Sequence, residues 1–324
     1  MLFTHLHLHT EYSLLDGAIL PKKLPDYLKE LGMDTCAITD HGVMGGVIEF
    51  YKAMTEAKLK PILGIEAYIT DDPDNKFDKT RDNMHMILLA KDVEGYSRLC
   101  EVVSKAAIEN FYYKPRIYKE NLRALQGHVV ATTACLNGIF ANRLQFNMNQ
   151  FDKCISVTDS SAVLDRELSF YRSIFKNDFY LELQVWDDED KKQTIYNKFL
   201  LEFGRKHGVP FTLAADCHYM RKEDHKLHEM LMALQLKMTL EEYRQMGTMQ
   251  YGPHFYVAGP EEMLQRAKSI NCEEAFNNTT VIANKCNTEL KLGVYRVPQF
   301  KIEDTPDYQN YLVWKKNTLK EGNQ

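Results

Sequence analysis

The sequence predicts an α/β protein, a distorted seven-stranded (β/α) barrel with a short, mostly helical C-terminal extension. Seven strand-like apolar runs alternate with helix-like stretches, which is typical of mainly parallel strands covered by helices. A chain of 324 residues suits a closed barrel better than an open sheet, although the alternation alone also fits the open form. The texture changes after residue 236, and a domain boundary is expected near residues 270–290.

Each expected element rests on its own local pattern. The strands are expected at residues 3–8, 35–39, 61–69, 86–90, 128–133, 179–185 and 210–215. The helix at 21–31 carries apolar residues at helical spacing and ends at Gly32, a favourable helix terminator. Further helices are expected at 43–58, 93–108, 136–144, 189–207 and 223–236, and after the change of texture at 260–268, 274–286 and 308–321.

The composition limits the cellular location and the kinds of partner that are expected for this chain. No apolar run approaches the roughly 20 residues that span a membrane, and the N-terminus lacks the pattern of a signal peptide, so a cytoplasmic protein without a membrane partner is expected. The seven cysteines form no CxxC pair, which argues against a disulfide framework or a zinc ribbon. The net charge of −5 means that a nucleic-acid substrate would need positive charge from bound ions or a neighbouring domain.

Metal-binding residue types fall at the ends of the expected strands, where (β/α) barrels carry their reactive groups. His7 and His9 close the first strand at period-two spacing, which places both on one side of it. The other candidates are Asp16, His41, Glu66, His85, Cys135, Asp216 and His218. Imidazole, carboxylate and thiolate are ligands of divalent transition metals, and this many donors could hold two or three ions. Such a site favours hydrolysis of phosphoesters.

Each of these residues also has an ordinary structural explanation when taken alone. A single His-x-His or Asp-His pair is common, and a lone Cys135 is more often a core residue than a ligand. His225 and His228 lie at helical spacing and are expected to face solvent or cap a turn, while His5 is expected beside the ligands rather than among them. The joint pattern is therefore the signal. Neither a Gly-x-Ser-x-Gly elbow nor a phosphate-binding Gly-x4-Gly-Lys-Ser/Thr loop occurs.

The same residues resemble a known family. The run from His5 to Gly17, His-Leu-His-Leu-His-Thr-Glu-Tyr-Ser-Leu-Leu-Asp-Gly, is similar to the first motif of the polymerase and histidinol phosphatase (PHP) domain. It is closest to the form at the N-terminus of the DNA polymerase III alpha subunit of bacteria, a C-family replicative polymerase. The resemblance continues through the segments 37–42, 49–52, 60–68, 88–91, 111–116, 134–138, 215–219 and the tail, and so covers nearly the whole chain.

The resemblance implies a PHP-type seven-stranded barrel in residues 1–280, with residues 281–324 as a linker or the incomplete start of the polymerase palm. It implies that all nine candidate donors are ligands of two or three divalent ions, with Zn²⁺, Mn²⁺ or Fe²⁺ all compatible. Asp16, Asp40 and Arg116 are expected to be catalytic, and Lys114 and Arg116 to bind the substrate phosphates.

The implied activity is 3′→5′ exonuclease proofreading during DNA replication, acting on the primer 3′ end. DNA polymerisation would require the palm that is missing from this chain. The remaining polymerase domains and other replisome subunits such as the sliding clamp are the expected partners. Two alternatives remain open: a free-standing phosphatase for small phosphomonoesters, and a catalytically silent domain that binds metal for structural reasons.

Overall fold

The computed structural model describes residues 2–71, 83–144, 157–186, 191–246, 252–295 and 304–321. The chain divides into two compact units, Met1–Glu289 and Leu290–Gln324. The first unit holds the sheet and ten of the eleven described α-helices, and the second holds helix α11 (Pro306–Glu321). Within the described residues, no helix is both long and apolar enough to cross a membrane.

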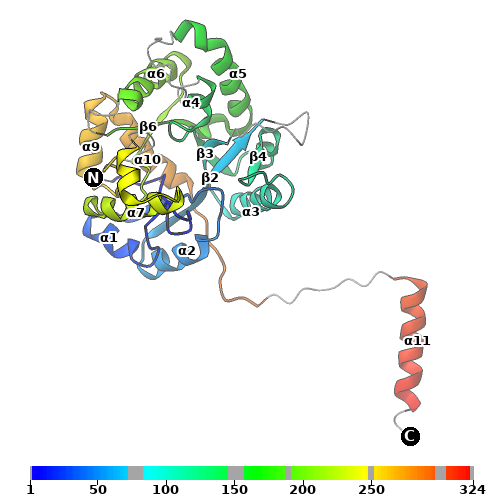
Figure 1. Ribbon diagram of the computed structural model, residues 1–324. Coiled ribbons are helices and arrows are strands. Elements are labelled where there is room, and N and C mark those ends of the chain that lie inside the picture. Colours follow the sequence, from blue (N-terminus) through cyan, green and yellow to red (C-terminus); the bar gives the residue numbers. More distant parts are fainter. Residues whose placement is uncertain are drawn as a thin grey trace. The chain divides into compact units, whose positions relative to one another are not determined.

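A curled sheet of seven strands forms the centre of the first unit (Figure 1). Along the sheet the order is β1-β2-β3-β5-β6-β7, with β4 paired to β2 outside this path. The strands are β1 (Thr35–Ile38), β2 (Lys60–Thr70), β3 (Met84–Ala90), β4 (Arg116–Tyr118), β5 (Val129–Thr132), β6 (Phe179–Gln184) and β7 (Phe211–Ala214). The expected α/β class and seven-stranded sheet are confirmed.

Two details of the sheet differ from the expectation. Residues 3–8 form no continuous strand; instead, isolated parallel bridges join His5 to Cys36 of β1 and Leu8 to Cys217, just after β7. The segment thus lies between the two outer strands of the path and completes the curl, while the short β4 makes the seventh strand. In addition, β3 runs antiparallel to both of its neighbours, β2 and β5, whereas the other pairs in the path are parallel.

Helices cover the outside of the curled sheet (Figure 1). Helices α2 (Val47–Glu56), α3 (Val93–Ile108) and α6 (Lys191–His207) pack against β2, β3 and β6 respectively. Helix α5 (Val157–Phe175), which the sequence pattern did not suggest, contacts β5 and β6. The remaining helices of this unit are α1 (Leu24–Glu30), α4 (Ile139–Arg143), α7 (His225–Gln235), α8 (Leu240–Gln245), α9 (Pro260–Ser269) and α10 (Glu273–Lys285).

Helix α10 packs against the sheet of the first unit. Its residues Ile282 and Ala283, together with Cys286, share a buried apolar cluster with Leu6 and Ile87 from the sheet side. Deleting a buried aliphatic side chain from such a core costs about 2–5 kcal/mol, so this helix contributes strongly to stability. The first unit consequently continues past residue 280 to Glu289.

Candidate metal centre

The sheet brings the candidate ligands to one edge, and the antiparallel β3 is essential to this. His41 follows β1, Cys135 follows β5, and Asp216 and His218 follow β7. His85 lies near the beginning of β3. If β3 were parallel to its neighbours, the beginning of this strand would lie at the opposite edge of the sheet from the other ligands. Because β3 is antiparallel, its beginning pairs with the end of β2, where Tyr68 lies opposite His85.

The centre of the cluster is formed by two imidazoles and two carboxylates. His7 Nε2 lies 3.0 Å from His9 Nε2, 3.4 Å from Glu66 Oε1 and 3.0 Å from Asp216 Oδ1. His9 Nε2 lies 3.5 Å from Glu66 Oε2 and 3.2 Å from Asp216 Oδ1. The side chains of His7, His9 and Glu66 are almost fully buried. One ligand atom from each of these three lies within 4.8 Å of the others, close enough to share an ion.

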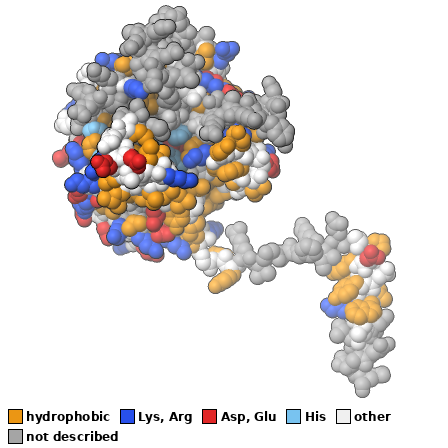
Figure 2. Space-filling model, viewed as in Figure 1, with side chains coloured by type: hydrophobic (Ala, Val, Ile, Leu, Met, Phe, Trp, Pro, Cys, Tyr) orange, Lys and Arg blue, Asp and Glu red, His pale blue; other side chains and the backbone are white. Residues whose placement is uncertain are grey.

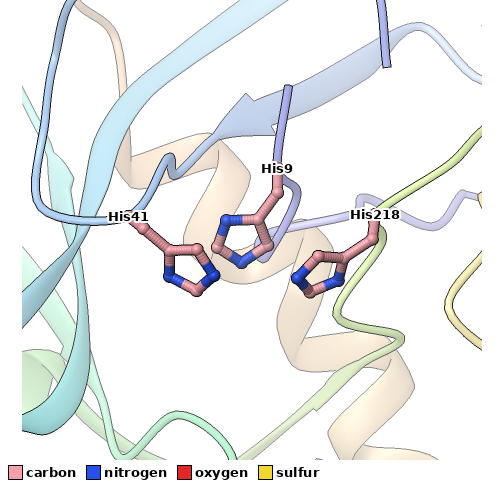
Figure 3. Close-up of side chains that lie close together, drawn as sticks. All are labelled: His9, His41 and His218. Carbon is pink, nitrogen blue, oxygen red and sulfur yellow. The ribbon is translucent and has the colours of Figure 1, made fainter. Parts of the chain in front are cut away.

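His9 also stands between two further imidazoles, those of His41 and His218 (Figure 3). The His9 ring centroid is 4.0 Å from that of His41 and 4.4 Å from that of His218, with the rings stacked in both pairs. Ring nitrogens of the three residues again lie within 4.8 Å of one another. The three histidines come from different parts of the chain, so only the closed sheet brings them together.

Glu66 connects this group to the remaining ligand candidates. Its carboxylate contacts His41 Nδ1 and lies 2.9 Å from His85 Nδ1. Cys135 Sγ lies 3.5 Å from the same His85 nitrogen and 4.0 Å from Glu66 Oε1. His41 and His85 are about 15% exposed, so solvent reaches the cluster from this side.

Asp16 completes the set of nine. One oxygen lies 3.1 Å from His41 Nε2 and the other 3.6 Å from His218 Nε2. Each of the nine expected donors therefore contacts at least one other member of the set. They form one continuous group, which we name the nine-donor cluster.

Asp40 lies beside the nine-donor cluster and supports it. Its carboxylate accepts hydrogen bonds from the backbone N–H and hydroxyl of Thr10 and from the hydroxyl of Ser13. Ser13 Oγ in turn lies 3.1 Å from His9 Nδ1 and accepts a hydrogen bond from the backbone N–H of His41. Asp40 thus fixes the loop that carries His9 and Asp16, while its expected catalytic role stays a prediction.

Three residues of the site loops have positive φ angles without being glycine. Leu15 precedes Asp16, Ala134 precedes Cys135, and Asp216 is itself a candidate ligand; their φ angles are 61°, 55° and 53°. Side chains disfavour this conformation, which costs about 1–3 kcal/mol where it is strained. Strain of this kind persists where the surrounding structure imposes it, and it commonly accompanies functional sites.

The residues present fit divalent metal ions. Glu66 Oε2 and Asp216 Oδ1 are buried and accept no hydrogen bond of normal geometry among the described residues, although imidazole nitrogens lie close to both. A buried carboxylate oxygen without a hydrogen bond is costly unless it has a charged partner. Here several carboxylate oxygens and imidazole nitrogens point toward the same positions and do not form separate hydrogen-bonded pairs. Such an arrangement is typical of the ligands of a metal ion.

Burial and neighbouring charges shift the pKa values of the cluster in opposite directions. Burial and the neighbouring His41 and His218 lower the pKa of His9 to about 3. Burial would also lower the pKa of His41, but Glu66 and Asp16 outweigh it and raise that pKa to about 10. Burial raises the pKa of the Cys135 thiol well above its ordinary value, with Glu66 adding to the shift. That thiol would ionise beside a bound cation, which is how cysteine becomes a metal ligand.

The expected substrate-binding residues lie on the segment that leads into β4. Lys114 Nζ is 5.1 Å from the ring centroid of Tyr68, and that ring is 5.3 Å from the His85 ring, so Lys114 lies near the cluster. Arg116 is buried; its guanidinium lies 5.0 Å from the Tyr112 ring centroid and its Nε donates to the Asn110 carbonyl at 3.5 Å. These contacts of Arg116 lie within its own segment, and its role in catalysis and phosphate binding stays a prediction.

Two residues beside the cluster were missed or misjudged from the sequence. Glu182 of β6 is buried and its Oε1 lies 2.7 Å from His7 Nδ1. A carboxylate in the middle of the mainly apolar run at 179–185 was the available signal. His228 of α7 was expected to face solvent, but it is fully buried and its Nε2 lies 3.4 Å from Asp16 Oδ1. That expectation was wrong because α7 turns its His228 face toward the loop that carries Asp16.

Comparison with known proteins identifies the family of this chain. The model of the PHP domain matches residues 5–185, which is more than half of the chain. This protein belongs to the PHP domain family. The matched range contains seven of the nine donors, and Asp216 and His218 follow it.

The PHP chain is also similar to DNA polymerase subunits. It is 38% identical over 291 residues to a DNA polymerase III subunit alpha from Helicobacter pylori J99, which covers 90% of this chain and 23% of the relative. It is 37% identical over 324 residues to that of Thermus aquaticus and 33% identical over 323 residues to that of Aquifex aeolicus. These alignments cover 96% of this chain but only 25% and 27% of the relatives. The chain thus spans about a quarter of the length of these relatives.

Proposed function

We propose that the nine-donor cluster is a divalent metal centre that hydrolyses phosphodiesters, and that its reaction is 3′→5′ exonuclease trimming of DNA. The observation that carries the proposal is the contact of all nine donors in one largely buried group. Purely structural ionic clusters have no need of five imidazoles and a thiol around three carboxylates. The group contains more donors than one ion can use, which supports two or three ions.

Three overlapping sets of side chains would hold the ions. They are His7, His9 and Glu66; His9, His41 and His218; and His41, Glu66 and His85. Asp16, Cys135 and Asp216 contact these sets and would complete them. Mixed nitrogen, oxygen and sulfur donors are compatible with Zn²⁺, Mn²⁺ or Fe²⁺. Bound ions would supply Lewis acidity and positive charge for phosphoester hydrolysis.

The protein's own groups would orient the substrate and exclude bulk water. The scissile phosphate would approach from the side of His41 and His85, where the cluster is partly exposed. Lys114 would attract the phosphate backbone from its position over Tyr68. Arg116 would add a second cationic contact, and Asp40 would hold His9 and His41 through Ser13. The acidic cluster disfavours anions on its own, so substrate binding should follow metal binding.

DNA is proposed as substrate because of the relatives. They are named DNA polymerase III subunit alpha, and DNA is the polymer on which such an enzyme acts. The net charge of −5, and the mixing of acidic, basic and hydrophobic side chains on the face shown in Figure 2, favour a binding mode in which bound ions neutralise phosphate. The primer 3′ end, further polymerase domains and replisome subunits such as the sliding clamp are the partners we propose. Residues 281–324 would form a linker or the start of the polymerase palm.

The test is hydrolysis of labelled DNA by the metal-loaded protein. A 5′-labelled primer with a mismatched 3′ terminus should shorten from its 3′ end when Mn²⁺ or Zn²⁺ is present, and remain intact with a chelator. A small phosphomonoester serves as the competing substrate. Release of phosphate from the monoester without trimming of DNA would show that the protein is a phosphatase and not an exonuclease. Tight metal binding with no turnover of either substrate would contradict catalysis altogether.

A further inference from the structure

A buried carboxylate, that of Glu182, lies behind the imidazole of His7 on the side away from the nine-donor cluster. Its Oε1 is 2.7 Å from His7 Nδ1, while the other ring nitrogen, Nε2, faces Glu66, Asp216 and His9. Glu182 is 1% exposed and His7 is fully buried. One ring nitrogen of His7 therefore contacts Glu182, and the other faces the nine-donor cluster.

Glu182 is itself held in place by several hydrogen bonds. The hydroxyl of Thr132 donates to Oε2 at 2.5 Å, and the amide of Gln184 donates to Oε1 at 2.9 Å. The backbone N–H of Glu182 donates to the hydroxyl of Thr133 at 3.0 Å. The support continues outward, because Asn197 of α6 donates to the Gln184 carbonyl. A carboxylate fixed in this way has little freedom to turn from His7.

We propose that Glu182 is a positioning residue that makes His7 a metal ligand: it accepts the Nδ1–H of His7 and so directs the Nε2 lone pair into the nine-donor cluster. This inference rests on the proposed metal centre. A hydrogen-bonded carboxylate fixes the tautomer of a ligating histidine, orients its ring and strengthens it as a donor. Without Glu182, His7 could place its proton on Nε2, where it could not coordinate an ion.

A simpler role for Glu182 is the burial of a hydrogen-bonded side chain that only stabilises the fold. The two roles differ in what a second substitution does. If Glu182 acts through His7, then removing His7 abolishes the effect of Glu182 on metal affinity. If it only stabilises the fold, both substitutions weaken the protein independently.

The experiment measures Mn²⁺ and Co²⁺ affinity of the metal-free protein by calorimetry, and the visible absorption of the Co²⁺ form. Glu182→Gln keeps the size of the side chain and removes its charge, and we expect about 10- to 100-fold weaker binding with an altered Co²⁺ spectrum. In a His7→Ala background, the same substitution should change the affinity less than about twofold. Glu167→Gln is the matched control, because Glu167 is also buried but pairs with Lys119 and Arg143, and it should bind metal as the wild type does.

Wild-type affinity in Glu182→Gln, or an equal loss with and without His7, would overturn the proposal. Should Glu182→Gln fail to fold, Thr132→Val removes one hydrogen bond from Glu182 and should weaken metal binding in the same direction, and wild-type affinity there would count against the proposal. Affinity and turnover are separate readouts. Loss of affinity in an enzyme that never cleaves DNA would support the role of Glu182 while refuting the exonuclease.

Discussion

Two charged groups, one partly exposed and one largely buried, lie at opposite edges of the same sheet, and they are built differently. At one edge Asp178 pairs with two lysines: each carboxylate oxygen lies 2.7 Å from an ammonium, one from Lys91 and one from Lys285. At the other edge three carboxylates of the nine-donor cluster are surrounded mainly by histidines, which carry no fixed positive charge. The first group supplies its own cations. The second has donors enough for cations that the chain does not provide.

This contrast explains why the two groups should respond differently to change. Breaking the Asp178 group should cost stability and leave the chemistry intact. Changes in the nine-donor cluster should mainly affect metal binding and catalysis. The contrast would be contradicted if changes at Asp178 impaired catalysis and changes in the nine-donor cluster affected only stability.

The largest effect is expected from Glu66→Gln. Glu66 contacts four histidines of the cluster, and its charge is the common attraction for bound ions. Losing several kcal/mol of stabilisation would reduce the cleavage rate by about 10³-fold. Initial rates on 3′-end substrates measure this, with Glu167→Gln as control. A rate within threefold of the wild-type rate would show that Glu66 is not part of the catalytic site.

Removal of the metal should come next. A chelator should abolish cleavage and lower the thermal stability, because ions bound only by the folded chain stabilise it by about 2.7 kcal/mol at a hundredfold excess over Kd. Scanning calorimetry with and without Mn²⁺ measures the shift. An Asp178→Asn protein should show the same metal-dependent shift as the wild type, since Asp178 lies at the other edge. No shift in either protein would mean that the cluster holds no ion.

A smaller effect is expected from His228→Gln. His228 lies 3.4 Å from Asp16 and orients it, so its loss should reduce kcat by about tenfold without abolishing metal binding. His225→Gln, one helical turn away on α7, is the control and should behave like the wild type. Equal effects of both substitutions would indicate a general disturbance of α7 rather than a specific contact with Asp16.

The smallest effect is expected from Asp178→Asn, and it concerns stability alone. Burial raises the pKa of Asp178, but hydrogen bonds from Lys285 and Lys91 outweigh it and hold the pKa below its ordinary value. A folded-state pKa below the unfolded value contributes stability above the unfolded pKa, about 3.9, and that stability is lost as the pH falls through the folded pKa. The variant should lose about 1–2 kcal/mol at neutral pH.

The pH dependence sharpens this last prediction. Chemical denaturation should show that the difference between wild type and Asp178→Asn shrinks as the pH falls below about 4. The exposed pair Glu120–Arg123 provides a control, since Glu120→Gln should change stability little at any pH. A difference that stays constant down to low pH would show that charge pairing is not the source of the stability.

Much of this arrangement was predictable from the sequence. Period-two spacing gave His7 and His9 a common side, and the strand-to-loop boundaries located His41, Cys135 and Asp216. The contact of all nine donors depends, however, on the direction of β3, which apolar patterning does not specify. The pattern at 86–90 fits either direction, and only pairing with β2 and β5 places His85 at the correct edge.

The missed residues share a physical reason. Glu182 and His228 lie on a strand and a helix for which tertiary packing determines which side chains point toward the cluster. Helical spacing in α7 gives the positions of His225 and His228 relative to one another, but not which of them turns inward. The domain boundary expected at residue 280 stays a prediction. The contacts of Ile282 and Ala283 of α10 with the core are likewise not visible in the local sequence.

The most direct test of the metal centre is anomalous diffraction from crystals grown with Mn²⁺ or Zn²⁺. Data collected on both sides of the metal absorption edge should show at least two peaks among the side chains of His7, His9, His41, Glu66 and His218. The same data from Glu66→Gln crystals should lose at least one of them. Wild-type maps without a peak inside the nine-donor cluster, at metal concentrations that saturate any calorimetric binding, would contradict the account.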